Sequence, residues 1–521
     1  MQHKTDLKHQ KIELNQHRVE LNQHRVELKQ HRIELKRKHA EITHLNELLR
    51  LARHKRFGSS SERFLNQPSL FNEAEDSIAL GPTANKELRN RKKSQKRRKL
   101  LPPELPREAI TYDITSDEKI CSCCKVPMHE IGTVVTEQLD IIPARVKVKK
   151  HIRKKYACGK CKQVIKVARM PKQVIPKSWA SPGLLATIAT NKYADCLPLY
   201  RQESILKRAG IDLARSTLAS WMIKLGELFQ PLINLMRDDL LSRPLIQADE
   251  TTIQVIKEKG RKAQAKSYVW VIGSGRLSQA PPILLFYYHP TRAASVPIGL
   301  LENWQGYLVT DAYDGYNKVV SKNRIIHCGC FDHVRRKFDE AIKARGTGAA
   351  PGLAEEGLWY LQKIYAVEAE ARTKSAKQRN IARNLYSKQI LKHLRKWLDR
   401  KINLIRPSSN TGKALNYLNS NWIKLTKFIE DPQIPISNEF CENAIRPFTV
   451  GRKNWLFSMT PNGADASCSI YSMIETAKAS GLEPYSYLNY IIERLPNCET
   501  IEEYEVLLPY KLDPKVLIEG E

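Results

Sequence analysis

A seven-residue repeat near the start of the chain restricts how this sequence can fold more than any other feature. The unit Ile/Val-Glu-Leu-Asn/Lys-Gln-His-Arg occurs three times between Ile12 and Arg32, and a partial fourth copy follows. An apolar residue at every seventh position is typical of the seam of a coiled coil. That seam consists of Leu7, Leu14, Leu21, Leu28, Leu35, Ile42 and Leu49. We therefore predict a coiled-coil oligomerisation helix over residues 1–56.

The second position of this seam is polar. If the leucines occupy position a of the heptad, histidines occupy position d in the repeats: His17, His24 and His31. A second apolar line (Ile12, Val19, Val26, Ile33) falls at position f, well round the helix from the seam. We expect a homo-oligomer with a weakly specified register, because polar d positions weaken a coil. The alternative, a histidine ladder that binds metal, is less favoured than a marginal polar seam.

The charge balance indicates a polyanionic partner. Lys and Arg number 86 against 55 Asp and Glu, which gives a formal net charge of +31. Such an excess favours a polyphosphate partner, such as double-stranded DNA, over a basic protein that binds nothing acidic. No apolar run has the length of a membrane span, and the polar N-terminus does not resemble a secretory signal. We expect a cytoplasmic, nucleoid-associated protein without a membrane partner.

Residues 57–108 are predicted to be a basic, flexible linker. Gly58–Ser61 and Gly81-Pro82 interrupt the helical pattern, and eight of the eleven residues from Arg89 to Lys99 are basic. Such runs are usually solvated and disordered, although they can contact phosphates without sequence preference.

Residues 109–176 contain two CxxC pairs and are predicted to form a small zinc-binding domain. The ligands would be the thiolates of Cys121, Cys124, Cys158 and Cys161. Two such pairs supply four sulfur ligands, which is the arrangement of a closed structural Zn²⁺ site. One pair alone would be weak support. The alternative, four unrelated cysteines, is less favoured.

Residues 177–240 are predicted to be a helical, helix-turn-helix-like DNA-binding segment. A helix from Pro198 to Arg208 is followed by a turn at Gly210 and by a second helix that Ser216 would cap. Base edges are reached from the start of the second helix in such motifs. Arg215, Ser216 and Thr217 stand there. Any two-helix hairpin has a similar pattern, so DNA contact and simple packing remain equal alternatives.

Two predicted strands each end on an acidic residue. The apolar run from Leu245 leads to Asp249, and the run from Gly306 leads to Asp311. A pair of divalent ions needs carboxylates that converge from adjacent strand ends, and this layout can provide them. Acids often follow strands, however, so from these residues alone both could be ordinary strand-end caps.

A third acid would have to come from the stretch between Ile434 and Trp455. Ser437 can cap a short helix that Pro447 would end, which puts Glu439 and Glu442 on nearly the same face. Three basic residues follow within reach of a phosphate backbone: Arg446, Arg452 and Lys453. The alternative is a helix whose acids pair with its own arginine.

Nearly the whole chain resembles transposases of the insertion sequence 66 family. The leucine-rich start with Lys55–Glu62, the double CxxC, and Lys192–Asp195 with Leu197–Arg201 are similar to successive regions of that family. Its three acidic motifs match Gln247–Thr251, Thr310–Tyr316 and the stretch that holds Glu442, Arg446-Pro447 and Gly451–Trp455. The resemblance assigns the second acid to Asp311 and not to Asp314.

The resemblance implies an α/β RNase H-like catalytic core over residues 241–465, with a helical insert at about 345–430 and a C-terminal helical tail at 466–521. Asp249, Asp311 and Glu442 would hold two Mg²⁺ or Mn²⁺ ions. The implied reaction is cleavage of DNA at the element ends, followed by strand transfer to target DNA. Accessory proteins encoded by the same element are also implied.

Some residues depart from the family pattern. Glu439 stands where a second asparagine is usual, and Asn443 follows the third acid where arginine is common. A second metal site could be formed by His327, Cys328, Cys330 and His333, although a packed strand-to-helix junction is favoured.

Two rival functions remain: a catalytically silent DNA-binding regulator derived from such an enzyme, and a metal-dependent nuclease that cuts without joining.

Overall fold

The computed structural model describes most of the chain. The described residues are 2–57, 123, 126, 146–157, 165–275, 277, 280–322, 324–345 and 351–518. They belong to two compact units, one made of residues 1–60 and 168–521 and the other of residues 61–167. No helix among the described residues has the length and apolar character that crossing a membrane requires.

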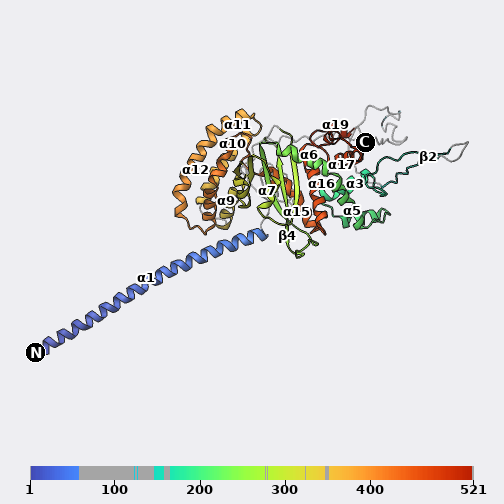
Figure 1. Ribbon diagram of the computed structural model, residues 1–521. Helices are drawn as coiled ribbons and strands as arrows, with labels where there is room; N and C mark the ends of the chain where they lie inside the picture. Colours follow the sequence, from blue (N-terminus) through green and yellow to red (C-terminus); the bar gives the residue numbers. More distant parts are fainter. Residues whose placement is uncertain are drawn as a thin grey trace. The chain divides into compact units, whose positions relative to one another are not determined.

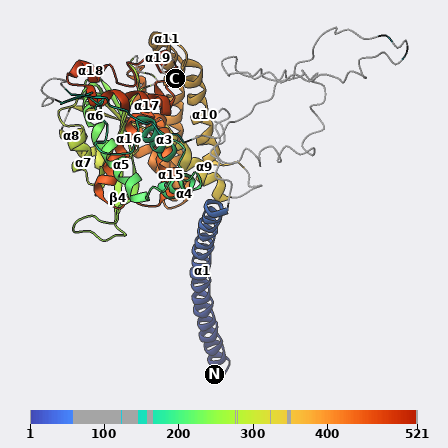
Figure 2. The same ribbon diagram turned by 90° about the vertical axis from the view of Figure 1, so that its right-hand side faces the viewer.

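The heptad segment forms one helix, α1 (Gln2–Phe57), as the repeat predicted. Figure 2 shows it as a single uninterrupted rod whose last turns lie beside α9 (Phe331–Arg345). There the side chain of Arg50 donates a hydrogen bond to the carbonyl of Arg345, at 2.8 Å. Three seam leucines are exposed among the described residues: Leu21, Leu28 and Leu35 are 62%, 69% and 69% exposed.

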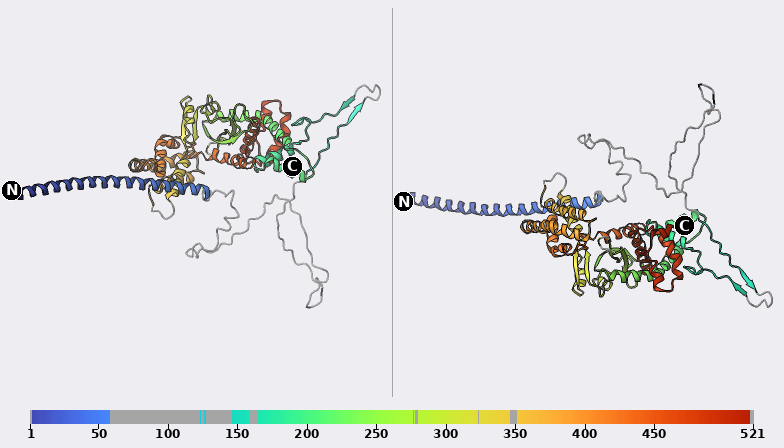
Figure 3. Two further views of the ribbon diagram at one scale, coloured as in Figure 1. Left: turned by 90° about the horizontal axis from the view of Figure 1, so that it is seen from below. Right: turned by 90° about the horizontal axis from the view of Figure 1, so that it is seen from above.

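The smaller unit contains a two-stranded antiparallel ribbon among its described residues. Strands β1 (Lys155–Ala157) and β2 (Ile165–Val167) pair with Tyr156 opposite Lys166 (Figure 3). Basic residues lie exposed along the approach to β1, where Lys147, Lys149 and Lys150 precede the strand.

Four helices follow, in the segment of residues 177–240 that the sequence predicted to be helical. They are α3 (Pro182–Tyr193), α4 (Leu199–Arg208), α5 (Arg215–Leu228) and α6 (Gln230–Leu241). Ser181 caps α3 by accepting the amide of Leu184. The expected cap of α5 is wrong: the helix begins at Arg215, and the carboxylate of Glu203 on α4 accepts the Arg215 amide at 2.8 Å. A side chain from another helix therefore satisfies this amide.

A five-stranded mixed sheet follows, with strand order β5-β4-β3-β6-β7. The strands are β3 (Leu245–Gln254), β4 (Lys266–Ser274), β5 (Ile283–His289), β6 (Gly306–Thr310) and β7 (Ile325–Gly329). Strand β3 pairs antiparallel with β4 and parallel with β6, and β6 pairs parallel with β7. Short helices α7 (Ser295–Leu300) and α8 (Gly315–Lys322) connect β5 to β6 and β6 to β7.

Helices lie on both sides of the sheet (Figure 1). Its buried residues belong to two hydrophobic clusters. Successive strand residues point to opposite faces, so Ile246 and Leu308 enter the cluster with α3, α5 and α6. Leu245 and Val309 enter the cluster with α9 and the helices that follow it. Consecutive residues of β4 and β5 are also buried, so both faces of these two strands are covered. This explains why their sequences are nearly continuous apolar runs.

The stretch between α9 and the third acidic motif is helical, as expected. Its elements are α10 (Leu353–Ala371), α11 (Ala376–Ala382), the π-helix η1 (Arg383–Ser387), α12 (Lys388–Lys401), η2 (Ile402–Leu404), α13 (Asn410–Ser420), α14 (Trp422–Leu425) and η3 (Thr426–Ile429).

Arg383 ties this helical insert to the chain that leads back to the sheet. Its fully buried guanidinium makes two hydrogen bonds to Glu368, at 2.9 and 2.7 Å. It also donates to the carbonyls of Phe428, Asp431 and Ile434. The bidentate pair with Glu368 holds Arg383 on α10. The three carbonyl bonds then fix the segment that immediately precedes the third acidic motif.

The final helices complete the core of the sheet domain. They are α15 (Glu439–Trp455), α16 (Pro461–Ala479), α17 (Pro484–Arg494), the 3-10 turn η4 (Leu495–Asn497), α18 (Ile501–Glu505) and α19 (Pro514–Ile518). The expected boundary between residues 465 and 466 falls inside α16. That helix covers β5, where Ser472 and Thr476 accept the amides of Phe286 and Leu284.

Candidate active site

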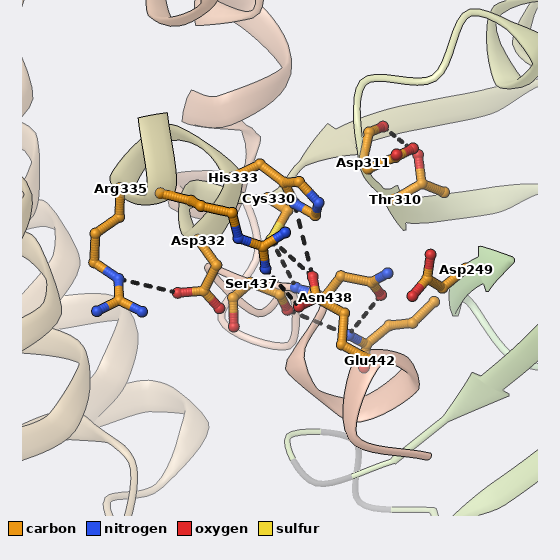
Figure 4. A network of polar contacts seen from close by, with 12 residues as sticks. Asp249, Thr310, Asp311, Cys330, Asp332, His333, Arg335, Ser437, Asn438 and Glu442 are labelled. Atoms are coloured by element: carbon orange, nitrogen blue, oxygen red, sulfur yellow. Dashed lines mark hydrogen bonds and ion pairs between the residues drawn. The ribbon is translucent and has the colours of Figure 1, made fainter. Parts of the chain in front are cut away.

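Two of the predicted acids lie at the same level of neighbouring strands. Asp249 is part of β3, and Asp311 directly follows β6. Strands β3 and β6 run parallel, with Gln247 opposite Val309. Asp249 and Asp311 each lie two residues beyond this pair, and Figure 4 shows both side chains on the same side of the sheet. The expected strand end at Asp249 is wrong, because β3 continues to Gln254, and only Asp311 directly follows its strand. The parallel register of β3 and β6 is what brings these two carboxylates together.

Glu442 comes from α15, whose first turn is anchored to β3. The side-chain amide of Asn438 donates to the carbonyl of Ala248, at 2.8 Å. Gln247 donates to the carbonyl of Ser437 at 3.2 Å, and Cys441 Sγ donates to the carbonyl of Gln247 at 3.2 Å. These buried contacts hold the start of α15 beside Asp249.

The helix that carries Glu442 differs from the one expected. The expected Ser437 cap is wrong, because Asn438 occupies the N-cap position without a side-chain cap hydrogen bond. Pro447 does not end the helix, which continues to Trp455. Proline removes one backbone donor, but Ile445 and Phe448 are buried on either side of it. Tertiary packing therefore outweighs the helix-breaking tendency.

Electrostatics link the three acids. The pKa of Asp249 lies well above its ordinary value, chiefly because the side chain is buried and also because Glu250, Glu442 and Asp311 are close. Burial likewise raises the pKa of Glu442. Neighbouring carboxylates disfavour the charged form of a carboxyl group, and a cation bound among them would relieve this repulsion. The arrangement is suited to binding divalent metal ions.

Glu250, the neighbour of Asp249, has a supporting role that the sequence did not reveal. Its side chain is 2% exposed. It accepts hydrogen bonds from Tyr316, at 2.7 Å, and from Arg292, at 2.8 Å. Burial raises the pKa of Glu250, whereas these two donors act against that rise. The ion pair joins β3 to Arg292, which follows β5, and the tyrosine contact joins β3 to α8, which follows β6.

Glu442 also faces a cysteine and a histidine at the start of α9 (Figure 4). Cys330 Sγ lies 3.6 Å and His333 Nδ1 lies 3.7 Å from Glu442 Oε1. Arg336 Nη2 lies 3.9 Å from the other oxygen, Oε2. Burial raises the pKa of the Cys330 thiol well above its usual value. Among the described residues, Cys330, His333 and Glu442 form a group of potential metal ligands. Their sulfur, nitrogen and oxygen atoms all lie within 4.8 Å of one another.

The other two residues of the Cys/His motif belong to a packed junction, as favoured from the sequence. His327 Nε2 lies 2.8 Å from the hydroxyl of Thr310, and burial lowers the His327 pKa to about 4. The Cys328 thiol is directed to the carbonyl of Ile326. The four residues considered as one metal set are therefore divided between two places.

The predicted DNA-binding residues fall into two groups. Arg215 and Ser216 are exposed and Thr217 is half-buried at the start of α5. Arg446 and Lys453 are exposed on α15. Arg452 is engaged within the protein instead: its Nη1 donates to the carbonyl of Thr252, to the Thr252 hydroxyl at 3.0 Å and to the Thr251 hydroxyl at 3.2 Å. Arg452 thus joins α15 to β3.

The expected zinc ligands lie outside the described residues. These ligands are Cys121, Cys124, Cys158 and Cys161. Other supporting residues were missed from the sequence, namely Gln247, Glu250, Arg292, Tyr316 and Asn438. Gln247, Glu250 and Tyr316 fall inside the matched motifs, but the partners of all five are more than 40 residues away along the chain, so no local pattern showed their supporting role.

Comparison with protein families covers most of the chain. Residues 177–466 match the family described as "Transposase IS66 family". Residues 118–162 match the zinc-finger binding domain of transposase IS66, and residues 472–510 match the IS66 C-terminal element. Residues 44–110 match a model described as "Transposase C of IS166 homeodomain".

Similar proteins occur in Sinorhizobium fredii. The uncharacterized protein y4jD is 31% identical over 435 residues, which cover 81% of this chain and 83% of that protein. The uncharacterized protein y4qI is 28% identical over 496 residues, which cover 91% of this chain and 90% of that protein. Together with the family match over more than half of the sequence, this similarity shows that the chain belongs to the IS66 family of transposases.

Proposed function

We propose that this protein is a DDE-type transposase that binds the ends of an insertion sequence and performs metal-dependent strand cleavage and strand transfer. The proposed catalytic residues are Asp249, Asp311 and Glu442. The observation that carries the proposal is geometric: the parallel register of β3 and β6 puts Asp249 and Asp311 at the same level, and the side chain of Asn438 ties the start of α15, with Glu442, to β3. The raised pKa of Asp249, to which Glu442 and Asp311 contribute, agrees with this placement. Three acids that come from two adjacent strands and a helix share one electrostatic environment.

The donor atoms suit hard divalent cations. Three carboxylates offer the oxygen ligands that Mg²⁺ and Mn²⁺ prefer. A bound pair of such ions would supply a nucleophile at neutral pH and stabilise the oxygen that leaves the scissile phosphate. The chain's own part is to hold the carboxylates: Asn438 and Gln247 fix α15 against β3, and Arg292 and Tyr316 fix Glu250 beside Asp249.

The sheet supports an RNase H-like core. Three antiparallel strands, β5, β4 and β3, continue into the parallel strands β6 and β7, and helices cover both faces. The first acid would stand on the central strand β3 and the second after its parallel neighbour β6. The helical insert would separate the second acid from the third.

We assign DNA recognition to the segments that precede the sheet. The exposed residues at the start of α5 and the basic approach to β1 support phosphate or base contacts. One structural Zn²⁺ on the four CxxC thiolates and self-association through α1 complete the proposal. Element-end DNA, target DNA, a second copy of the chain and accessory proteins of the same element are the proposed partners.

The function is tested by incubating the purified full chain with element-end DNA and Mg²⁺ and separating the products. Nicked ends together with joined strands are the expected result. Nicked DNA without joined products would instead support a metal-dependent nuclease. Tight binding of the ends without any cleavage would support a DNA-binding regulator.

A further inference from the structure

Cys330, His333 and Glu442 bring three different ligand types together. Cys330 precedes α9 and His333 lies in its first turn, so the three-residue spacing directs both side chains to the same side. Glu442 meets them from α15. Sulfur, imidazole nitrogen and one carboxylate oxygen all lie within 4.8 Å of one another.

The distances fit the edges of a coordination tetrahedron. For a central zinc with Zn–S of about 2.3 Å and Zn–O of about 2.1 Å, the sulfur–oxygen edge is about 3.6 Å. Cys330 Sγ lies 3.6 Å from Glu442 Oε1. The corresponding nitrogen–oxygen edge is about 3.4 Å, and His333 Nδ1 lies 3.7 Å from the same oxygen. The third edge, between Cys330 Sγ and the His333 nitrogen, is within 4.8 Å and would be about 3.6 Å in the same tetrahedron, so an adjustment of about an ångström at most would complete the geometry.

The hydrogen bonds around the cluster also favour a cation. His333 Nδ1 is buried and makes no hydrogen bond to the described residues, an arrangement that normally costs free energy unless a ligand is present. The backbone amide of Asn438 donates a hydrogen bond to Cys330 Sγ, at 3.2 Å. Such a donor stabilises a metal-bound thiolate. Arg336 faces Oε2 of Glu442, which leaves Oε1 directed at Cys330 and His333.

We propose that Cys330, His333 and Glu442 form a binding site for a zinc-class divalent cation. The mixed sulfur, nitrogen and oxygen donors select such an ion over Mg²⁺, which prefers oxygen ligands. Three protein ligands leave a fourth position open. The inference rests in one respect on the proposed function: Glu442 would belong both to this site and to the catalytic set. Zinc binding would then withdraw a carboxylate oxygen from catalysis and slow strand cleavage.

The test measures zinc content and does not depend on activity. The full chain is equilibrated with ZnCl₂, desalted and analysed for zinc per chain. We expect the wild-type protein to hold one zinc ion more than Cys330→Ser and one more than His333→Ala. The His333 change affects a partly exposed side chain, so it keeps the test valid if the buried Cys330→Ser variant folds poorly.

Cys328→Ser is the matched control. Cys328 is buried two residues away, but its thiol faces the carbonyl of Ile326 and not the cluster. This variant should keep the wild-type zinc content. Equal zinc in the wild-type protein, Cys330→Ser and His333→Ala would overturn the proposal and leave a hydrogen-bonded cluster without a metal.

Asp249→Asn separates this inference from the proposed function, because Asp249 lies outside the cluster. The variant should keep the additional zinc and lose strand cleavage. If it keeps both zinc and cleavage, the cation site stands and the catalytic assignment fails. If the wild-type protein cleaves DNA but holds no zinc that depends on Cys330, the cation site fails and the catalytic assignment stands.

Discussion

At the residue scale, the sequence identified some parts of the site and missed others for physical reasons. Asp249 and Asp311 each follow an apolar run, so a local pattern marks them, although Asp249 lies within its strand and not at the strand's end. Glu442 and Glu439 share a helix turn, and only the family motif distinguished them. The side-chain amide of Asn438 donates a hydrogen bond to the carbonyl of Ala248, 190 residues earlier in the chain. Contacts of this kind arise from the tertiary fold and leave no local signal.

Arg383 provides a prediction at this scale. Arg383→Met removes the partner of Glu368, whose side chain is only 10% exposed. An uncompensated buried charge costs about 3–5 kcal/mol, so the denaturant midpoint for unfolding of the sheet domain should fall markedly. Arg395→Met is the control. Its ion pair with Asp399 is on the surface and should contribute less than about 1 kcal/mol. Equal midpoints for the two variants would refute the role given to Arg383.

At the scale of elements, helices and strands were largely predictable from apolar periodicity, whereas their ends were not. The start of α5 depends on Glu203 from a neighbouring helix, and α15 passes through Pro447 because its flanking residues are buried. The C-terminal helices looked like a separate tail in the sequence. Only the fold reveals that α16 covers β5.

The crossing of α5 and α16 gives a second prediction. A Cβ added at Gly226 would lie 2.6 Å from Cα of Ala466. Gly226→Ala should therefore push two core helices apart and lower the stability by about 1–3 kcal/mol, seen as a lower midpoint of thermal unfolding. Gly463→Ala, on α16 itself, would meet its nearest atom at an ordinary 3.5 Å. A stability loss that is the same in both variants would contradict close packing at Gly226.

The start of α5 gives a third prediction, for DNA binding. Arg215→Ala should weaken binding of element-end DNA and reduce the salt dependence by about one phosphate contact. Lys224→Ala removes the same charge from an exposed position further along α5 and should have a much smaller effect. Titrations at several salt concentrations measure both. If the two variants bind equally well, the start of α5 does not contact DNA.

At the scale of the whole molecule, self-association is predicted to reside in α1. Replacing the exposed seam residues Leu21, Leu28 and Leu35 together by serine should produce a smaller species in light scattering, because the apolar seam is lost. The control replaces Val19, Val26 and Ile33, on the f line, by serine. If the control dissociates and the seam variant does not, the heptad assignment is wrong.

The central claim is that Asp249, Asp311 and Glu442 are the catalytic acids. The most direct measurement is strand cleavage and joining of element-end DNA by Asp249→Asn, Asp311→Asn and Glu442→Gln. Each near-isosteric change removes one charge that offsets the repulsion between two closely spaced cations. All three variants should lose both reactions, at least a thousandfold on a scale of about 1.4 kcal/mol per tenfold change in rate.

Glu439→Gln is the matched control within the same turn of α15, where Glu439 accepts a hydrogen bond from Asn443. It should keep substantial activity, and all four variants should still bind element-end DNA, because recognition is assigned to other segments. Near wild-type cleavage by Glu442→Gln, or an inactive Glu439→Gln beside an active Glu442→Gln, would contradict the assignment.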